Sequence, residues 1–440
     1  MKSPLVRTSL LSVISLACAA SAYAQSAQRA AFIANNGNLE GAVTSFVIGD
    51  DGRPTFVQKL VIQTRPASGP AVPGTNAYAI DISPSGRFIA TTHTTALDPE
   101  QVTIIEIAAD ATMNVVETAI TPNSPLELRW VTDTLLVVTR TQFGGANEVI
   151  SYTFDPESAT LVEADRGPGG SFTSALDVHP NRRFVYAGDS NSFFIRVFDV
   201  SPAGELTEIQ TFPTGGTYPL SLEVSPDGSR LYAGGGISGN DDRILGCFID
   251  ANGMLSEIPG SPFISSDRAP NKSSFSPDGA LLFVAHGSDG TVLSFAINAE
   301  NGVLTETGFS YDFGIQGSVG DVQTLGEFVL VTDSFSAIDN RVGLFTFDVL
   351  ATGEFTETGP IVGSEATAPT QIAVWNPPQP NCPADLDRDG SIGLTDLAIL
   401  LINFGLPSGA TPGQGDTDRD GDVDLVDLAT LLTVFGSVCE

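Results

Sequence analysis

A strand–turn–strand unit that recurs through most of the chain restricts its fold more than any other feature. The clearest copies read YAIDISPSGRFIA, SALDVHPNRRFVYA, LSLEVSPDGSRLYA and SSFSPDGALLFVA, and weaker ones read LELRWVTDTLLVV and GDVQTLGEFVLVT. The copies begin at Tyr78, Leu126, Ser174, Leu220, Ser273 and Gly320. Their spacing of roughly 45 to 50 residues is typical of β-propeller blades. The alternation of apolar and polar residues predicts four-stranded antiparallel sheets.

The leftover strands at the two ends of this region complement one another. QIAVWNP near Gln371 matches an innermost strand with no blade after it, while AAFIANN, AVTSFVIGDDGR and TFVQKLVIQ lie near the N-terminus. Joined, they predict a seventh blade that both chain ends share and that removes a free sheet edge. We therefore expect a mostly β fold, a seven-bladed β-propeller over residues 25–376, followed by the Pro-rich linker 377–381.

Two acidic loops near the C-terminus predict calcium sites. DLDRDGSIGLTD and DTDRDGDVDLVD both read D-x-D-x-D-G-x5-D, and each leads into an apolar helical pattern. Gly390 and Gly421 stand where such a loop turns sharply, so that the oxygens around it converge on one Ca²⁺ ion per loop. The predicted ligands are Asp385, Asp387, Asp389, Ser391 and Asp396 in the first loop, and Asp416, Asp418, Asp420, Asp422 and Asp427 in the second.

With Asp rather than Glu at position 12 and no helix before either loop, residues 382–440 resemble the type I dockerin family. The resemblance implies a small all-α domain that docks onto a cohesin-bearing scaffold protein of an extracellular, polysaccharide-degrading assembly. Positions 10 and 11 are Leu394–Thr395 and Leu425–Val426, and neither helix carries Lys or Arg, so the identity of the cohesin does not transfer. Antiparallel helices would bring Cys382 and Cys439 together as a disulfide outside the cell.

The N-terminus of the chain indicates its compartment, and its net charge limits its partners. Residues 1–24 carry a basic start, an apolar stretch and an A-x-A site, which predict a secretory signal peptide. No other stretch approaches the ~20 apolar residues of a membrane span, so we expect a secreted or cell-surface protein. A formal net charge of -32 argues against nucleic-acid partners.

The propeller repeat, with its SPDG turns and LYA strands, is similar to the lactonase or YVTN family that includes the 6-phosphogluconolactonases. The resemblance spans residues 25–378 and implies the fold. Enzymes of this family carry a Pro-Arg-His run entering an inner strand, and the corresponding places here, SFTSALDVHP, TYPLSLEVSP and RAPNKSSFSP, lack it. No G-x-S-x-G elbow occurs in context, so serine catalysis is not supported, and no phosphate-cradling glycine loop is found in context either.

Repeat alignment predicts two columns of polar residues on the propeller. The first follows the second strands and contains His93, Arg140, Asp189, His286 and Asp333. It has the residue types that general-base or metal-assisted hydrolysis of an ester or lactone needs, or else it is a rim of residues ending strands. The second follows the innermost strands and contains Asp81, Arg129, Asp177, Glu223, Ser274, Asp321 and Val374. Its carboxylates are solvated, paired with Arg129, or ligands of a further divalent cation in the channel.

Three functions fit these observations. The first is a propeller that binds a polysaccharide or small molecule and is tethered through the dockerin. The second is a lactonase-like or carbohydrate-acting hydrolase, tethered in the same way. The third is a structural surface protein whose calcium loops recruit no partner.

Overall fold

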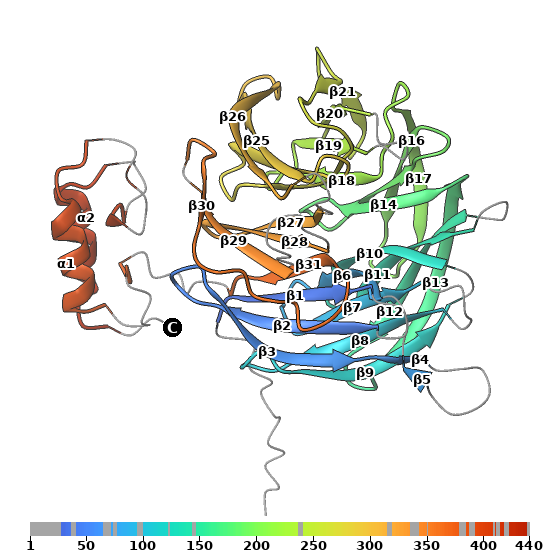
Figure 1. Cartoon of the computed structure of the whole chain (residues 1–440), viewed down its shortest axis with the longest axis horizontal. Coiled ribbons are helices and arrows are strands. Elements are labelled where there is room, and N and C mark those ends of the chain that lie inside the picture. The colour runs from blue at the N-terminus through green and yellow to red at the C-terminus, as the bar shows by residue number, and fades with distance from the viewer. Residues whose placement is uncertain are drawn as a thin grey trace, which may run out of the picture. The chain divides into compact units, whose positions relative to one another are not determined.

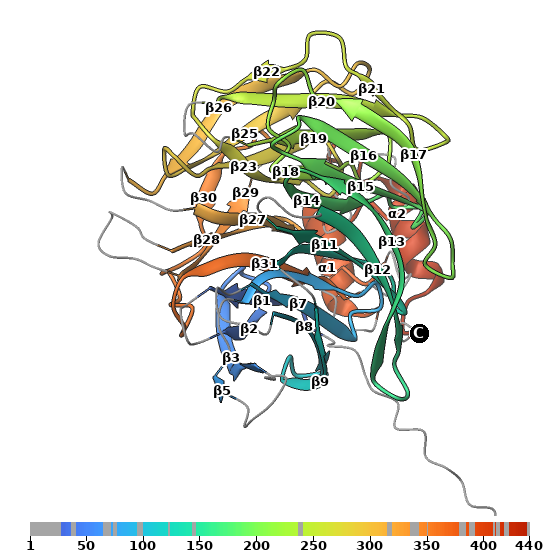
Figure 2. The same ribbon diagram turned by 90° about the vertical axis from the view of Figure 1, so that its right-hand side faces the viewer.

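The computed structural model of the chain describes residues 28–36, 41–64, 72–73, 77–94, 100–121, 124–142, 147–235, 241–314, 319–334, 343–349, 351–377, 384–386, 392–407, 410, 414–417 and 422–437. The chain divides into two compact units, residues 1–376 and 377–440. Seven antiparallel sheets of four or five strands surround one axis in the first unit (Figures 1 and 2). The predicted seven-bladed propeller is confirmed.

Six blades follow one another along the chain, each built outward from an innermost strand. Blade 1 holds β6 (Ala77–Ile82), β7 (Phe88–His93), β8 (Gln101–Ile107) and β9 (Met113–Ile120). Blade 2 holds β10 (Ser124–Thr132), β11 (Leu135–Thr141), β12 (Asn147–Asp155) and β13 (Thr160–Gly170). Blade 3 holds β14 (Thr173–Val178), β15 (Phe184–Asp189), β16 (Phe194–Val200) and β17 (Leu206–Pro213).

Blade 4 holds β18 (Ser221–Val224), β19 (Arg230–Gly234), β20 (Arg243–Ile249) and β21 (Leu255–Glu257), with β22 (Phe263–Ile264) also paired to β20. Blade 5 holds β23 (Pro270–Phe275), β24 (Leu281–His286), β25 (Thr291–Ile297) and β26 (Leu304–Asp312). Blade 6 holds β27 (Val319–Leu325), β28 (Phe328–Asp333), β29 (Gly343–Val349) and β30 (Phe355–Glu357). A two-stranded ribbon, β4 (Gln63–Thr64) and β5 (Val72–Pro73), lies outside the blades.

The seventh blade joins the two ends of the propeller, as the leftover strands predict. Its order is β3-β2-β1-β31, with β1 (Ala30–Asn35), β2 (Ala42–Ile48) and β3 (Pro54–Val61) from the start and β31 (Pro369–Trp375) from the end. Ala30 lies opposite Trp375, and Ile33 opposite Ile372, in an antiparallel pairing. This blade closes the ring through backbone hydrogen bonds, so that every innermost strand in the described part of the chain belongs to a sheet.

The turn between the first and second strands explains the recurring Ser-Pro-x-Gly pattern. In blade 5 the Ser276 hydroxyl accepts the backbone N–H of Leu281 at 2.9 Å and so holds the turn shut. Gly86 of blade 1 has a φ of +70°, and a Cβ there would lie 2.5 Å from the Trp375 ring. The turn therefore needs glycine both for its backbone conformation and for close packing. His179 of blade 3 is a turn residue and accepts the N–H of Asn181 at 3.0 Å.

Large apolar side chains fill the spaces between neighbouring blades. The ring of Phe154 in blade 2 packs edge-on against Phe88 of blade 1, with centroids 5.0 Å apart. Trp130 completes this cluster from the innermost strand of blade 2, and it is 1% exposed. Cys247 is buried in the cluster of blades 3 and 4, where burial raises the pKa of its thiol to about 12. It is a small apolar core residue rather than a nucleophile.

The second unit holds the two predicted helices, α1 (Leu394–Asn403) and α2 (Leu425–Thr433). Each begins at position 10 of its acidic loop, so that the position-12 aspartate lies in the first turn of the helix. The Asp396 carboxylate accepts the backbone N–H groups of Leu386 and Gly393, both at 2.6 Å, and the Asp427 carboxylate repeats both contacts in the second half at 2.7 Å. The unit is therefore internally duplicated. Within the described residues neither helix has the length and apolarity to cross a membrane.

Candidate active site

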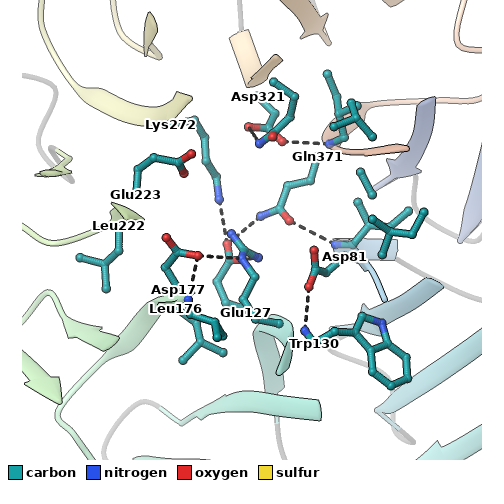
Figure 3. A pocket seen from close by; sticks show the side chains of 18 of the residues that line it. Asp81, Glu127, Trp130, Leu176, Asp177, Leu222, Glu223, Lys272, Asp321 and Gln371 are labelled. Carbon is teal, nitrogen blue, oxygen red and sulfur yellow. Dashed lines mark hydrogen bonds and ion pairs between the residues drawn. The ribbon is translucent and has the colours of Figure 1, made fainter. Parts of the chain in front are cut away.

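A cavity of about 450 Å³ lies on the propeller axis, and all seven innermost strands contribute to its lining (Figure 3). Exposed residues mark its mouth at the turns that follow these strands. They are Pro84, Arg182 and Asn376. The lining carries the carboxylates of Asp81, Glu127, Asp177, Glu223 and Asp321, and the cations of Arg129, Arg182 and Lys272. The axial column that repeat alignment predicts is thus in place, except that Ser274 does not line the cavity.

A buried polar bridge ties three blades together at the end where the innermost strands begin. Glu127 of blade 2 is 3% exposed, and its carboxylate accepts hydrogen bonds from Lys272 Nζ at 2.9 Å and Gln371 Nε2 at 2.6 Å. Gln371 Oε1 in turn accepts the N–H of Ile80 at 3.2 Å. Because these side chains come from blades 2, 5 and 7, they bridge the axis (Figure 3).

The axial aspartates join each blade to the next. Asp81 accepts the backbone N–H of Trp130 at 2.7 Å, Asp177 that of Val224 at 2.7 Å, and Asp321 that of Ile372 at 2.9 Å. The Ser274 hydroxyl accepts the N–H of Thr324 at 3.1 Å in the same way. Part of the acidic column therefore has a structural function, since it satisfies buried backbone donors at the joints between blades.

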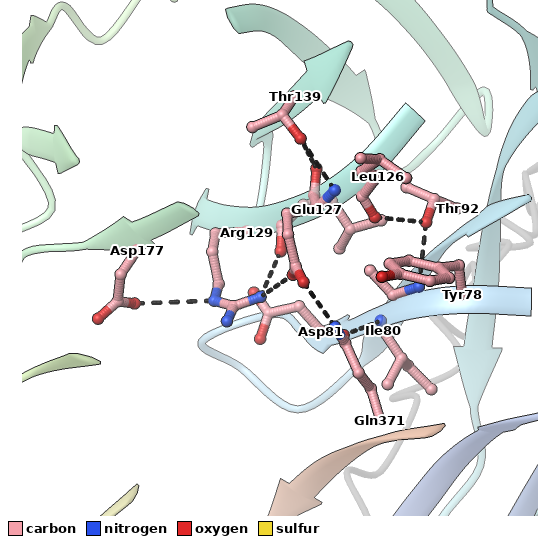
Figure 4. Close-up of polar contacts among 12 residues, drawn as sticks. Tyr78, Ile80, Asp81, Thr92, Leu126, Glu127, Arg129, Thr139, Asp177 and Gln371 are labelled. Carbon is pink, nitrogen blue, oxygen red and sulfur yellow. Dashed lines mark hydrogen bonds and ion pairs between the residues drawn. The ribbon is translucent and has the colours of Figure 1, made fainter. Parts of the chain in front are cut away.

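Arg129 lies between the acidic residues of blades 2 and 3 (Figure 4). Its NH1 is 3.4 Å from Glu127 Oε2 and donates to the carbonyl of Leu128 at 2.8 Å, while its Nε is 3.7 Å from Asp177 Oδ1. The guanidinium is planar and permanently charged, so it can hold two carboxylates and still present one edge to the cavity.

Glu223 differs from the other axial carboxylates. Within the described residues its carboxyl group has neither a hydrogen bond nor an ion pair, although it lines the cavity. Burial, and after it the negative charge of Asp177, hold the pKa of Glu223 well above its usual range. Burial also raises the pKa of Asp81 and of Asp321 to about 6. The raised pKa favours the protonated form of Glu223 beside a second carboxyl group, an arrangement suited to proton transfer.

The predicted column on the second strands lies away from this cavity. His93 is opposite Ala77, Asp189 opposite Thr173, His286 opposite Pro270 and Asp333 opposite Val319, each pair at the start of an innermost strand. The cavity mouth is at the other end of those strands. None of His93, Arg140, Asp189, His286 and Asp333 lines the cavity.

Three of these residues form hydrogen bonds or ion pairs with nearby residues of their own blade or an adjoining loop. Asp189 is fully buried and accepts the N–H groups of Ser171 and Phe172 at 2.8 and 2.9 Å. His286 is fully buried, with Nε2 2.8 Å from Ser265 Oγ, and burial lowers its pKa to about 4. Arg140 pairs with Glu148 at 2.6 Å. His93 and Asp333 are likewise fully buried. That these five residues are catalytic stays a prediction, and they are not part of the axial cavity.

Sequence reasoning missed Glu127, Lys272 and Gln371. Glu127 and Lys272 each lie two residues before a member of the predicted axial column, Arg129 and Ser274. Since alternate residues of a strand face the same side, extending the column by one step of period two would have found both. Gln371 lies three residues before the column member Val374, so this rule would not have found it.

The predicted metal ligands of the second unit are described only in part. Asp387, Asp389, Ser391, Asp418 and Asp420 lie outside the described residues, as do Cys382, Cys439 and the predicted signal peptide. In the second loop, carboxylate oxygens of Asp422, Asp424 and Asp427 all lie within 4.8 Å of one another. These hard oxygen donors fit a calcium ion. In both halves the position-12 carboxylate is buried, with Asp396 1% and Asp427 0% exposed.

Comparisons with known proteins agree with the fold. A family model described as "Lactonase, 7-bladed beta-propeller" matches residues 162–244. A protein of Bacteroides uniformis assigned as a 6-phosphogluconolactonase has a TM-score of 0.63 at 17% identity, over 79% of this chain and 99% of that one. The periplasmic gluconolactonase of Pseudomonas aeruginosa has a TM-score of 0.61 at 16% identity, over 80% and 99%. No curated protein matches the chain. The described residues of the first unit therefore form a seven-bladed propeller that is similar to those of lactonases.

Proposed function

We propose that the propeller hydrolyses a lactone in its axial cavity. The observation that carries the proposal is the pair of Asp177 and Glu223 beside Arg129. A lactonase needs a group that takes a proton from water, a group that gives one to the leaving oxygen, and a positive charge for the developing oxyanion. The three residues supply these in one cavity. The lactonase family model and the names of the two structural neighbours support the same chemistry.

The reaction balances with the two carboxyl groups sharing one proton. Burial raises the pKa of Asp177, and the positive charge of Arg129 acts in the opposite direction and favours its carboxylate form. In that form Asp177 accepts a proton from water as the water oxygen bonds to the lactone carbonyl carbon. Arg129 stabilises the negative charge that develops on the carbonyl oxygen. The ring C–O bond then breaks, and the ring oxygen takes the proton of Glu223. The product is the open hydroxy acid, and the shared proton has moved from Glu223 to Asp177.

Glu223→Gln tests the proposal on the full-length protein. The substitution keeps the shape of the side chain and removes only its transferable proton. Because Glu223 has no hydrogen bond within the described residues, we expect the fold to persist. Proton release from a panel of sugar lactones should fall about 100-fold or more in kcat. Glu257→Gln, at an exposed position of β21, is the matched control and should keep full activity. Undiminished turnover in Glu223→Gln, or no turnover by the wild-type protein, would refute the mechanism.

We also propose that the second unit binds two calcium ions and docks onto a cohesin-type module of an exported assembly. Support comes from apolar residues that both halves expose at corresponding positions. Leu394 and Leu425 are 77% and 70% exposed, Leu401 and Leu432 both 53%, and Phe404 and Phe435 42% and 41%. An exposed apolar surface of this kind is typical of a protein interface. The predicted signal peptide is consistent with export.

Titration of the full-length protein with purified cohesin modules, with calcium and then with EDTA, tests this second proposal. Calcium-dependent binding supports it. If no cohesin binds, Leu394 and Leu425 serve another partner or none, and the structural-protein hypothesis gains. Substituting both Leu394 and Leu425 by Ser should weaken binding and leave lactone hydrolysis unchanged.

A further inference from the structure

We infer that the axial cavity takes an uncharged sugar lactone and rejects lactones that carry a phosphate or carboxylate. The inference rests on the proposed function and names the substrate class of the same site. It follows from the balance of charges in the lining and from which hydrogen-bonding groups remain available. A phosphorylated sugar lactone would then not be the substrate of this propeller.

The lining has more carboxylates than cations, and its two inner cations are already engaged. Lys272 Nζ is 2.9 Å from Glu127, and its side chain is 19% exposed. Arg129 lies between Glu127 and Asp177, and its side chain is 22% exposed. A phosphate of charge about -1.5 to -2 would have to break one of these pairs or lie beside uncompensated carboxylates. Like charges close together in a partly desolvated site weaken binding strongly.

Backbone donors are also engaged. Anion sites commonly use free N–H groups of the backbone. Here the N–H groups of Trp130, Val224 and Ile372 on the innermost strands are taken by the axial aspartates. The cavity therefore offers an anion few donors.

Acceptors, in contrast, are plentiful. The carboxyl group of Glu223 has no hydrogen bond in the described part of the chain and can accept at its carbonyl oxygen even when protonated. Each axial aspartate keeps lone pairs beyond its backbone contact. The hydroxyl groups of a neutral sugar are donors that match such a lining. Several carboxyl groups around a polyhydroxylated ligand are chemically complementary to it, because its hydroxyl groups can donate to their oxygen atoms.

Arg182 is the one cation of the lining that a phosphate could reach at the mouth. It is exposed, and its NH1 donates to the carbonyl of Trp130 at 3.3 Å. Water and salt screen a charge at such a position. The variant Arg182→Gln therefore tests whether a phosphate group binds at the cavity mouth.

The test compares glucono-1,5-lactone with its 6-phosphate on the full-length protein at pH 7.5. We expect kcat/KM to favour the neutral lactone by about 10-fold or more, and Arg182→Gln to leave this preference in place. Equal or better turnover of the phosphate would overturn the inference. If Arg182→Gln then abolished that turnover, the phosphate would bind at the rim.

Binding separates this inference from the proposed function. Calorimetry with 1,5-anhydroglucitol and its 6-phosphate, which cannot be hydrolysed, reports the selectivity even if no lactone is turned over. Tighter binding of the neutral compound without turnover of any lactone would refute the proposed lactonase activity and support the preference for an uncharged ligand. Tighter binding of the phosphate, or no binding of either compound, would overturn the selectivity itself.

Discussion

His286 illustrates what a single buried residue does to the pH dependence of stability. Burial lowers its pKa from 6.5 to about 4, so the folded protein holds it neutral while the unfolded chain protonates it below 6.5. Stability from this residue is complete above pH 6.5 and is lost as the pH falls toward 4. A shift of this size corresponds to about 3 kcal/mol.

We therefore expect His286→Asn to lack this part of the acid dependence. Urea unfolding between pH 4 and 7.5, followed by tryptophan fluorescence, reports on the propeller because Trp130 and Trp375 both lie in it. The difference in unfolding free energy between wild type and variant should shrink as the pH falls. Parallel curves at every pH would show that His286 is not held neutral.

For single residues, the sequence indicated which positions are equivalent from blade to blade, but not how deeply each one is buried or how far it lies from the cavity mouth. Counting from the turn correctly identified His93 and Asp333 as equivalent positions, yet each ends a second strand at full burial. Position in a repeat says nothing about which end of the axial channel is open. The mouth depends on Arg182 and Asn376, which follow the innermost strands, and only the packed ring makes it visible.

Among the elements, the joint between β27 and β31 holds the ring closed. Asp321 is 3% exposed, and its two oxygens accept the N–H groups of Val322 and Ile372, both at 2.9 Å. Asp321→Ala would leave both donors without an acceptor in a buried place. Each such loss destabilises by about 1–3 kcal/mol.

We expect Asp321→Ala to lower the unfolding free energy by about 2–4 kcal/mol and to speed hydrogen exchange of the Ile372 amide. Asp312→Ala, at the exposed end of β26, is the matched control and should change stability little. Unchanged exchange at Ile372 in Asp321→Ala would contradict a role for this contact in closing the ring.

The strands themselves were largely predictable because the turn chemistry repeats. Ser276 and Gly86 mark turns whose hydrogen bonds and positive φ the sequence pattern encodes. The closing blade was predictable because an inner strand without a blade and three strands without an inner one must complement each other. In contrast, β22 and the β4–β5 ribbon pair outside the repeat, so no periodicity signals them.

In the whole molecule, the two compact units have separate cores. Leu386, Ile392, Leu400, Val423 and Leu431 form the buried cluster of the second unit, and the propeller clusters contain none of them. A small core of this kind gains much of its stability from bound metal, because the metal binds the folded state and not the unfolded one. Calcium removal should therefore act on one unit alone.

We predict that EDTA reduces the helical circular dichroism at 222 nm while the tryptophan fluorescence of the propeller stays unchanged. Excess calcium should restore the signal, and the double variant Asp396→Asn and Asp427→Asn should show the reduced signal without EDTA. Both tryptophans lie in residues 1–376, so fluorescence reports on the propeller only. If EDTA also shifted the fluorescence-detected unfolding of the propeller, the axial carboxylates would hold a divalent cation as well. The same shift in the double variant, in which the axial carboxylates are intact, would instead mean that the two units depend on each other for stability.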